Sequence, residues 1–87
     1  METTVRVVNR AGLHTRPAAM LVKIASKYKS DIYLVRDGFS INAKSIIGVM
    51  TLAAEQGAEL GLTVHGVDEQ DAAEAVMQLF ASGFDEI

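Results

Sequence analysis

The apolar residues of this chain follow two spacings in turn, and this alternation limits the possible folds more than any other feature. Leu60, Leu62 and Val64 alternate with more polar neighbours, as in a strand with one buried face. Between Asp68 and Ser82, apolar residues recur every three or four positions, as on one face of a helix. The predicted elements in chain order are a strand at 3–8, a helix at 15–28, strands at 31–35 and 39–43, a helix at 46–53, a strand at 59–65 and a helix at 69–81.

This order, βαββαβα, predicts a two-layer α+β fold. Strands with one apolar face and three amphipathic helices favour a four-stranded antiparallel sheet covered on one face by the helices. The 87 residues suffice for one hydrophobic core, so we expect a single domain over residues 1–87. The pair Asp37-Gly38 is typical of a tight hairpin turn, and Ser45 is typical of a helix N-cap. Such folds serve many functions, so the fold alone identifies none.

Composition excludes several functional classes. The chain has no cysteine, which removes disulfides, thiol catalysis and thiolate metal sites. No apolar run reaches the length of a membrane span, and the first residues lack the pattern of a signal peptide. We therefore expect a cytoplasmic protein without membrane insertion.

Charge is distributed unevenly along the chain. Residues 1–44 hold all eight basic residues and three acidic ones, a net charge of +5, whereas residues 45–87 hold eight acidic residues and no basic one, a net charge of −8. One interpretation is that folding intermixes these charges over the surface. The other is a basic zone around Arg10, Arg16 and Lys23 that favours anionic ligands or acidic partners. The total charge of −3 and the lack of a basic and aromatic ladder argue against nucleic acid.

The stretch AGLHTRPAA places His14 at the predicted start of the first helix. Unpaired backbone amides and the helix dipole stabilise an anion at such a position and favour a neutral imidazole, which is a competent nucleophile toward a phosphoryl group. Arg16 adds donors suited to phosphate oxygens, Pro17 stiffens the first turn, and Gly12 permits a backbone turn. The pattern therefore predicts an anion site with a possible phosphohistidine. An ordinary cap with an incidental arginine is the alternative.

The short helix at 46–53 carries more apolar residues than one face can bury. If Val49 and Leu52 face the core, helical spacing places Ile46, Ile47 and Met50 on another face, where they would form a docking patch. Simple core packing is the alternative for these three. The second histidine, His65, ends a strand on its polar side, and we assign it no role.

Three segments together resemble one protein family. They are GLHTRPAAMLVKIASKY, NAKSIIGVMTLAAEQGAEL and GVDEQDAAEAV, which follow one another over nearly the whole chain. The sequence is thereby similar to HPr, the histidine-containing phosphocarrier family of the bacterial phosphoenolpyruvate-dependent phosphotransferase system. Agreement of separated motifs in one order makes this resemblance more specific than any one of them.

The resemblance implies an HPr-like open-faced β-sandwich and a set of functional residues. His14 would accept a phosphoryl group from enzyme I on its pros nitrogen, Nδ1, and pass it to a IIA protein or domain for sugar uptake. Arg16 would steady that group. Ser45 would be the regulatory serine that HPr kinase/phosphorylase modifies in some bacteria, with a role as helix cap only as the alternative. The implied partner-docking residues are Thr15, Ala19, Lys23, Ile46, Ile47 and Met50.

The same resemblance implies a carrier and not an enzyme. We expect no cofactor and no metal of its own, since magnesium and phosphoenolpyruvate would belong to enzyme I, and we expect a monomer. A transcriptional regulator is a further partner that the resemblance allows.

Three alternatives remain open at the level of sequence. A hydrolase or phosphatase could use His14 as nucleophile or base, but acidic residues concentrate in the last helix and none is expected beside the His14 motif. A regulator that works by docking alone is the second, although such relatives replace the histidine. A nitrogen-branch regulatory phosphocarrier is the third, because VNRAGLH and the tail at 79–86 are similar to that branch, whereas NAKSIIGVM is closer to carriers of the sugar branch.

Overall fold

One antiparallel sheet, with the strand order β1-β4-β2-β3, forms one layer of the molecule. The computed structural model describes residues 1–86. Its strands are β1 (Glu2–Arg6), β2 (Asp31–Arg36), β3 (Phe39–Asn42) and β4 (Glu59–His65). The turn between β2 and β3 uses the positive φ angles of Asp37 and Gly38, 50° and 83°, as the sequence predicts.

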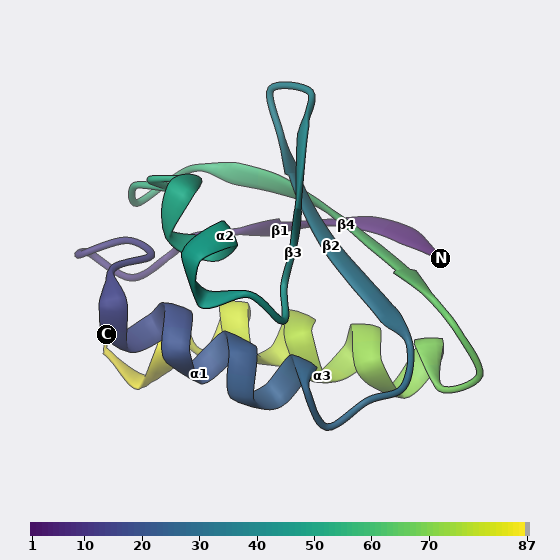
Figure 1. The fold of residues 1–87 in the computed structure, drawn as a ribbon. Coiled ribbons are helices and arrows are strands. Elements are labelled where there is room, and N and C mark those ends of the chain that lie inside the picture. The colour runs from purple at the N-terminus through teal and green to yellow at the C-terminus, as the bar shows by residue number, and fades with distance from the viewer. Residues whose placement is uncertain (87) are drawn as a thin grey trace.

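Helices form the second layer and pack on one face of the sheet (Figure 1). They are α1 (Thr15–Ala25), α2 (Ile46–Thr51) and α3 (Glu69–Ala81), followed by the short 3-10 helix η1 (Gly83–Asp85). The helices α1 and α3 lie side by side in opposite directions, and α2 packs against α1 and β3. The end of α3 therefore lies beside the start of α1. The predicted α+β open-faced sandwich is confirmed.

The core lies between the sheet and the helices, and it is formed by the apolar residues at the strand and helix spacings predicted from the sequence. Alternate residues of β4 and the apolar stripe of α3 are buried, and Val49 and Leu52 after the start of α2 face inward as predicted. The residues with the largest side chains in this core are Leu21, Ile32, Leu34, Leu60, Leu62, Phe80 and Phe84.

Several predicted boundaries were wrong by a few residues. Helix α1 ends at Ala25 and not at residue 28, because Lys27 and Tyr28 donate to carbonyls three residues earlier, in tight turns that end the helix. The α2 helix ends at Thr51 and not at residue 53 for the same reason, and Ala53 then takes a positive φ of 47°. The first strand spans 2–6 instead of 3–8.

Asp68 occupies the predicted position before α3, but its side chain does not cap that helix. Its carboxylate instead accepts hydrogen bonds from the backbone amides of Lys29 and Ser30 and from the Ser30 hydroxyl. These hydrogen bonds, that of the Ser30 hydroxyl first, lower the pKa of the Asp68 carboxyl. Asp68 thereby fastens the turn between α1 and β2 to the start of α3.

Candidate functional site

His14 is the N-cap of α1, as the sequence predicts. Its φ and ψ of −80° and −168° are extended, and its backbone oxygen accepts the Ala18 amide at 3.0 Å, so the helix begins immediately after it. The imidazole makes no cap hydrogen bond, and 43% of its side chain is exposed. Pro17 is buried in the first turn, where its missing amide costs no helical hydrogen bond. The imidazole therefore lies at the surface beside the first turn of α1 without a hydrogen bond to the backbone of that turn.

The loop before His14 is fixed by close backbone contacts. Gly12 has a φ of 73°, and a Cβ atom added there would lie 2.5 Å from the Ala54 carbonyl oxygen. The next amide, that of Leu13, donates to this same oxygen at 2.9 Å. Asn9 is fully buried and donates from Nδ2 to the Gly12 oxygen at 2.8 Å. Glycine at position 12 is therefore required by both its conformation and the space around it.

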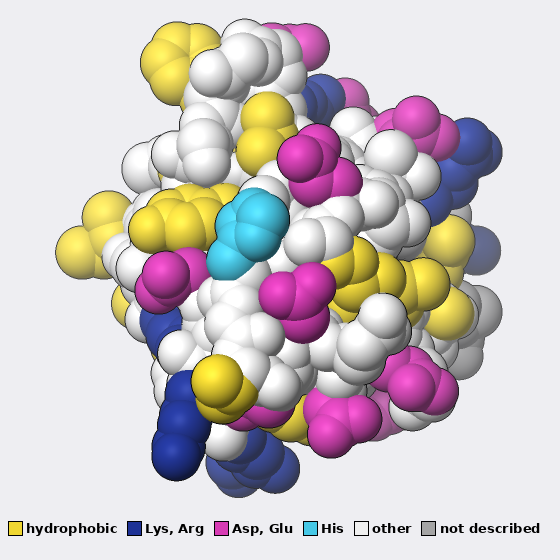
Figure 2. Space-filling model, turned by 90° about the vertical axis from the view of Figure 1, so that its right-hand side faces the viewer, with side chains coloured by type: hydrophobic (Ala, Val, Ile, Leu, Met, Phe, Trp, Pro, Cys, Tyr) yellow, Lys and Arg dark blue, Asp and Glu magenta, His cyan; other side chains and the backbone are white. Residues whose placement is uncertain are grey.

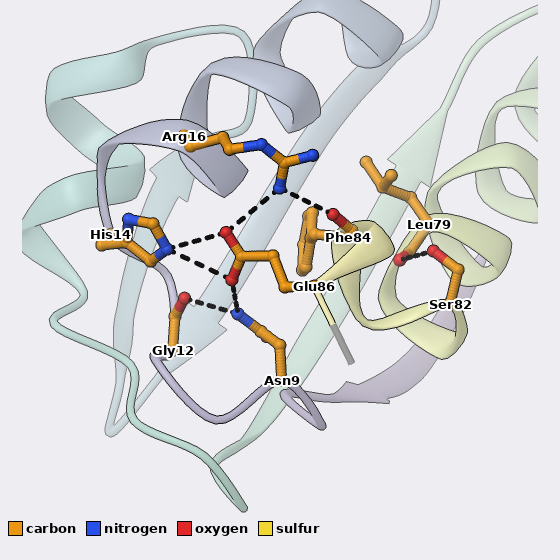
Figure 3. Close-up of polar contacts among 8 residues, drawn as sticks. All are labelled: Asn9, Gly12, His14, Arg16, Leu79, Ser82, Phe84 and Glu86. Carbon is orange, nitrogen blue, oxygen red and sulfur yellow. Dashed lines mark hydrogen bonds and ion pairs between the residues drawn. The ribbon is translucent and has the colours of Figure 1, made fainter.

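A carboxylate from the far end of the described chain lies against the imidazole (Figure 3). The Nε2 atom of His14 is 2.9 Å from Oε2 and 3.2 Å from Oε1 of Glu86. Figure 3 shows Nδ1 on the opposite side of the ring, pointing away from this carboxylate. Within residues 1–86, no hydrogen bond to Nδ1 is present. The expectation that no acidic residue lies beside the His14 motif was therefore wrong.

Arg16 contacts the same carboxylate. Its Nη1 atom lies 3.1 Å from Oε2 of Glu86 and donates to the Phe84 carbonyl oxygen at 2.9 Å. Among the described residues, Nη2 and Nε of Arg16 have no partner, so these donors are available to another anion. The side chains of His14 and Arg16 thus converge on one acceptor, which neither the motif nor its spacing indicated.

Glu86 is held from below by Asn9, whose Nδ2 donates to Oε1 at 2.9 Å. This hydrogen bond is the main cause of a lowered pKa of the Glu86 carboxyl; partial burial works against it, and the contacts from Arg16 and His14 add to the lowering. Only 17% of the Glu86 side chain is exposed. The group beside His14 is therefore an ionised, partly buried carboxylate at neutral pH.

The end of α3 explains how Glu86 reaches the site. The Ser82 hydroxyl donates back to the Leu79 oxygen at 2.8 Å, and Gly83 takes a φ of 65°, which reverses the chain. Phe84 is fully buried, and its ring packs edge-on against Phe80 with centroids 5.0 Å apart. Burial of Phe84 turns the following residues toward α1. The sequence predicted the stop at 82–83 but not this return.

The predicted docking residues lie on exposed parts of α1 and α2. Thr15, Ala19 and Lys23 are exposed on α1. On α2, the exposed fractions are 38% for Ile46, 75% for Ile47 and 44% for Met50, so packing in the core does not account for these three apolar side chains. We call Ile46, Ile47 and Met50 the α2 patch.

Ser45 is the N-cap of α2, as predicted. Its hydroxyl oxygen accepts the Gly48 amide at 3.1 Å, and the residue is only partly exposed. The cap role of Ser45 is thereby confirmed.

Acidic and basic side chains intermix on the surface of the molecule (Figure 2). Figure 2 shows the end that faces right in Figure 1, where single acidic side chains are spread over the surface. The first turn of α3, with Glu69 and Asp71, lies at this end. Arg10, before α1, and Lys23, in the last turn of α1, are exposed, but the charge of Arg16 is offset by Glu86. The predicted basic zone is therefore weaker at Arg16 than its sequence indicates.

The arrangement can support nucleophilic chemistry at one ring nitrogen. The His14 imidazole is exposed, a carboxylate occupies one of its nitrogens, and the other nitrogen is uncontacted within residues 1–86. Together with the unused donors of Arg16, this suits the reversible transfer of an anionic group.

Among the described residues 1–86, every helix is too short or too polar to span a membrane.

Comparison with known proteins gives this chemistry a family. The model of a family described as the PTS HPr component phosphorylation site matches residues 1–82. The chain belongs to the HPr family. The phosphocarrier protein HPr of Treponema pallidum is 55% identical to it over 83 residues, which cover 95% of this chain and 94% of that protein. The protein is thus a phosphocarrier of the phosphotransferase system.

Solved HPr structures agree with this fold. A crystal structure of HPr from Thermoanaerobacter tengcongensis matches with a TM-score of 0.95 and 42% identity, covering 100% of this chain and 98% of that one. A structure described as the HPr dimer of the same organism matches with a TM-score of 0.75 and 41% identity over 97% of both chains. An HPr can therefore crystallise as a dimer, and the monomer expected here stays a prediction.

Proposed function

We propose that Nδ1 of His14 accepts a phosphoryl group from enzyme I and passes it to a histidine of a IIA protein or domain in sugar uptake. The observation that carries this proposal is the His14 ring itself, which is exposed at the N-cap of α1 with Nδ1 uncontacted within residues 1–86. The N–P bond must form and break readily in both directions. A shallow, exposed site suits that requirement better than a deep pocket.

Arg16 is the residue that would steady the transferred group. Its Nη1 atom is held by the Phe84 oxygen and Glu86, which keeps the guanidinium close to His14. The Nη2 and Nε donors then remain for phosphoryl oxygens. Because a carrier must release its cargo, one shared arginine is a more suitable ligand than a closed ring of donors.

The surface around His14 supports docking of enzyme I and IIA. The α2 patch is apolar and exposed, and α2 packs against α1, which carries exposed Thr15, Ala19 and Lys23. Apolar contacts with a polar and basic margin are typical of transient protein interfaces. We infer that both partners use this surface in turn.

Ser45 would regulate that docking through phosphorylation by HPr kinase/phosphorylase. A phosphate on its hydroxyl would add about two negative charges at neutral pH next to Ile46, the first residue of α2. The charge favours the helix start but disturbs a surface that meets acidic partners. A transcriptional regulator that reads the modified surface would be a further partner.

The proposal is tested by incubating the protein with enzyme I, magnesium and phosphoenolpyruvate and recording its intact mass at neutral pH. We expect one added phosphoryl group that acid removes, because phosphohistidine is acid-labile. His14→Ala should gain none, and His65→Ala, which changes the exposed histidine of β4, should gain one like the parent. Phosphorylation of His14→Ala, or none of the parent with an enzyme I active on another HPr, would contradict the assignment.

The acceptor is tested separately by adding IIA proteins of the sugar and nitrogen branches to the phosphorylated carrier. Faster transfer to a sugar-branch IIA supports the proposed role. Faster transfer to a nitrogen-branch IIA would identify a regulatory phosphocarrier instead. Partner binding that His14→Ala leaves unchanged, together with no transfer to either acceptor, would favour a regulator that acts by docking alone.

A further inference from the structure

We propose that Glu86 is a positioning residue for His14, which holds the imidazole with its proton on Nε2 and its lone pair on Nδ1. This inference rests on the proposed phosphorylation of His14 for its consequence, but its structural content concerns the unmodified protein. It is carried by the contact of Nε2 with both carboxylate oxygens, at 2.9 and 3.2 Å.

The hydrogen-bond donors around Glu86 indicate that its carboxylate is ionised. Glu86 accepts from Nδ2 of Asn9 at 2.9 Å and from Nη1 of Arg16 at 3.1 Å, and both donors serve an ionised acceptor better than a neutral one. An ionised carboxylate can only accept hydrogen bonds. The remaining partner, Nε2 of His14, must therefore be the donor in this contact.

The donor role of Nε2 also determines the tautomer of the His14 imidazole. A neutral imidazole carries a single proton, so a proton held on Nε2 leaves Nδ1 with its lone pair. A carboxylate that fixes a histidine tautomer in this way also fixes the orientation of the ring. Nδ1 points away from Glu86 in Figure 3, on the side of the ring that the carboxylate does not cover. The contact therefore presents the nucleophilic nitrogen, ready for attack.

Glu86 also affects the charge that develops on the His14 ring during phosphoryl transfer. As the lone pair of Nδ1 forms the new N–P bond, the bond from phosphorus to the donor atom of enzyme I breaks and its electron pair stays with the donor. The proton stays on Nε2, so positive charge develops on the His14 ring. A carboxylate at 2.9 Å from Nε2 stabilises that charge. Glu86 thus assists the reaction without touching the transferred group.

The support beneath Glu86 indicates a preformed device. Asn9 is fully buried and bridges Glu86 to the Gly12 oxygen, two residues before His14 in the chain. Phe84, fully buried against Phe80, sets the backbone from which Glu86 projects. Carboxylate, ring and loop are therefore held to one another by buried groups on both sides.

The test reads the tautomer directly, by long-range ¹H–¹⁵N spectra of the His14 ring at alkaline pH, where the imidazole is neutral. We expect the parent to show protonated Nε2 and unprotonated Nδ1. Glu86→Ala should move the ring toward a mixture of both tautomers. Glu86→Gln retains an oxygen acceptor without the charge and should keep the tautomer of the parent. Glu74→Ala, the same change at an exposed glutamate of α3, is the matched control and should leave the spectrum unchanged.

The same variants are then compared in phosphorylation by enzyme I. Glu86→Ala should lower kcat by about tenfold, with KM for this carrier little changed, because the loss is one charge-assisted hydrogen bond at the ring and not a docking contact. Glu86→Gln should fall between Glu86→Ala and the parent. Backbone amide spectra of the variants show whether each is folded.

The outcomes separate this inference from the proposed function. A parent ring with mixed tautomers, or a Glu86→Ala ring with the tautomer of the parent, overturns the role of Glu86 even if His14 is phosphorylated normally. Conversely, if no variant accepts a phosphoryl group, the proposed function fails, whereas the tautomer spectra still decide whether Glu86 positions the ring.

Discussion

The Leu13 amide donates to the Ala54 carbonyl oxygen at 2.9 Å and so joins the loop that carries His14 to the segment that follows α2. Arg36 supports the same segment, since its guanidinium donates to the Leu52 oxygen at 3.2 Å and to Glu55 at 2.7 Å. The loop that carries the proposed phosphorylation site and the helix that carries the α2 patch are therefore joined through one segment. Contacts at this junction should affect both.

Gly12→Ala tests the junction. The positive φ of Gly12 and the approach of its missing Cβ to the Ala54 oxygen predict a loss of about 2 kcal/mol in the free energy of unfolding. Urea denaturation measures it. Gly38→Ala is the matched control, since Gly38 has a φ of 83° but nothing within 4 Å of an added Cβ. It should cost less, and equal losses would show that space at Gly12 plays no part.

Ile47→Ser tests the α2 patch. With 75% of its side chain exposed, Ile47 should contribute little to folding but should lose apolar contact with enzyme I. We expect KM for this carrier to rise about tenfold, as for an interface anchor worth about 1.4 kcal/mol. Val67→Ser is the control, because Val67 is 90% exposed on the loop before α3. An unchanged KM for Ile47→Ser would remove Ile47 from the interface.

Two substitutions of Ser45 distinguish its role as the cap of α2 from its proposed regulatory role. Ser45→Ala loses the hydrogen bond to the Gly48 amide and should lower the free energy of unfolding by about 1 kcal/mol, while leaving transfer from enzyme I nearly unchanged. Ser45→Asp keeps a capping side chain but adds charge, so it should remain stable and yet raise KM for this carrier. Equal kinetics for the two variants would argue against regulation through charge at this position.

Asp68 should make stability depend on pH. Its pKa is lowered in the folded protein, so the ionised form contributes stability at neutral pH, and this contribution is lost as pH falls through the lowered folded pKa, below the usual aspartate value of about 4. Asp68→Asn should therefore be less stable than the parent at neutral pH, with the difference shrinking in acid. Denaturation series at several pH values measure this gap. A gap that stays constant with pH would contradict the ionic role.

The fold was predictable from the sequence because its information is local. Apolar alternation in β4, the helical stripe of α3 and the Asp37-Gly38 turn each depend on neighbouring residues, and all three are confirmed. Helix ends were less predictable, because the final turns of α1 and α2 tighten without any glycine or proline to mark the change. Local rules predicted that the Asp68 side chain caps α3, but the carboxylate instead accepts a hydrogen bond from the Ser30 amide, a partner distant in the chain.

The site was predictable only in part. His14, Arg16 and Ser45 lie at helix starts, where residue type and position alone suggest chemistry. Glu86 and Asn9 could not be found in that way, because their partners lie 72 and 77 positions away along the chain and no periodic pattern links them. The one available signal was Phe84, an apolar residue after a helix stop, whose burial returns the chain to α1.

The position of the phosphoryl group in the modified protein tests the proposed role of His14 most directly. Long-range ¹H–¹⁵N spectra with ³¹P coupling, recorded on carrier phosphorylated by enzyme I at neutral pH, distinguish the two ring nitrogens of each histidine. We expect phosphorus on Nδ1 of His14, with Nε2 still beside Glu86. Phosphorus on Nε2 of His14, or on His65, would contradict that role.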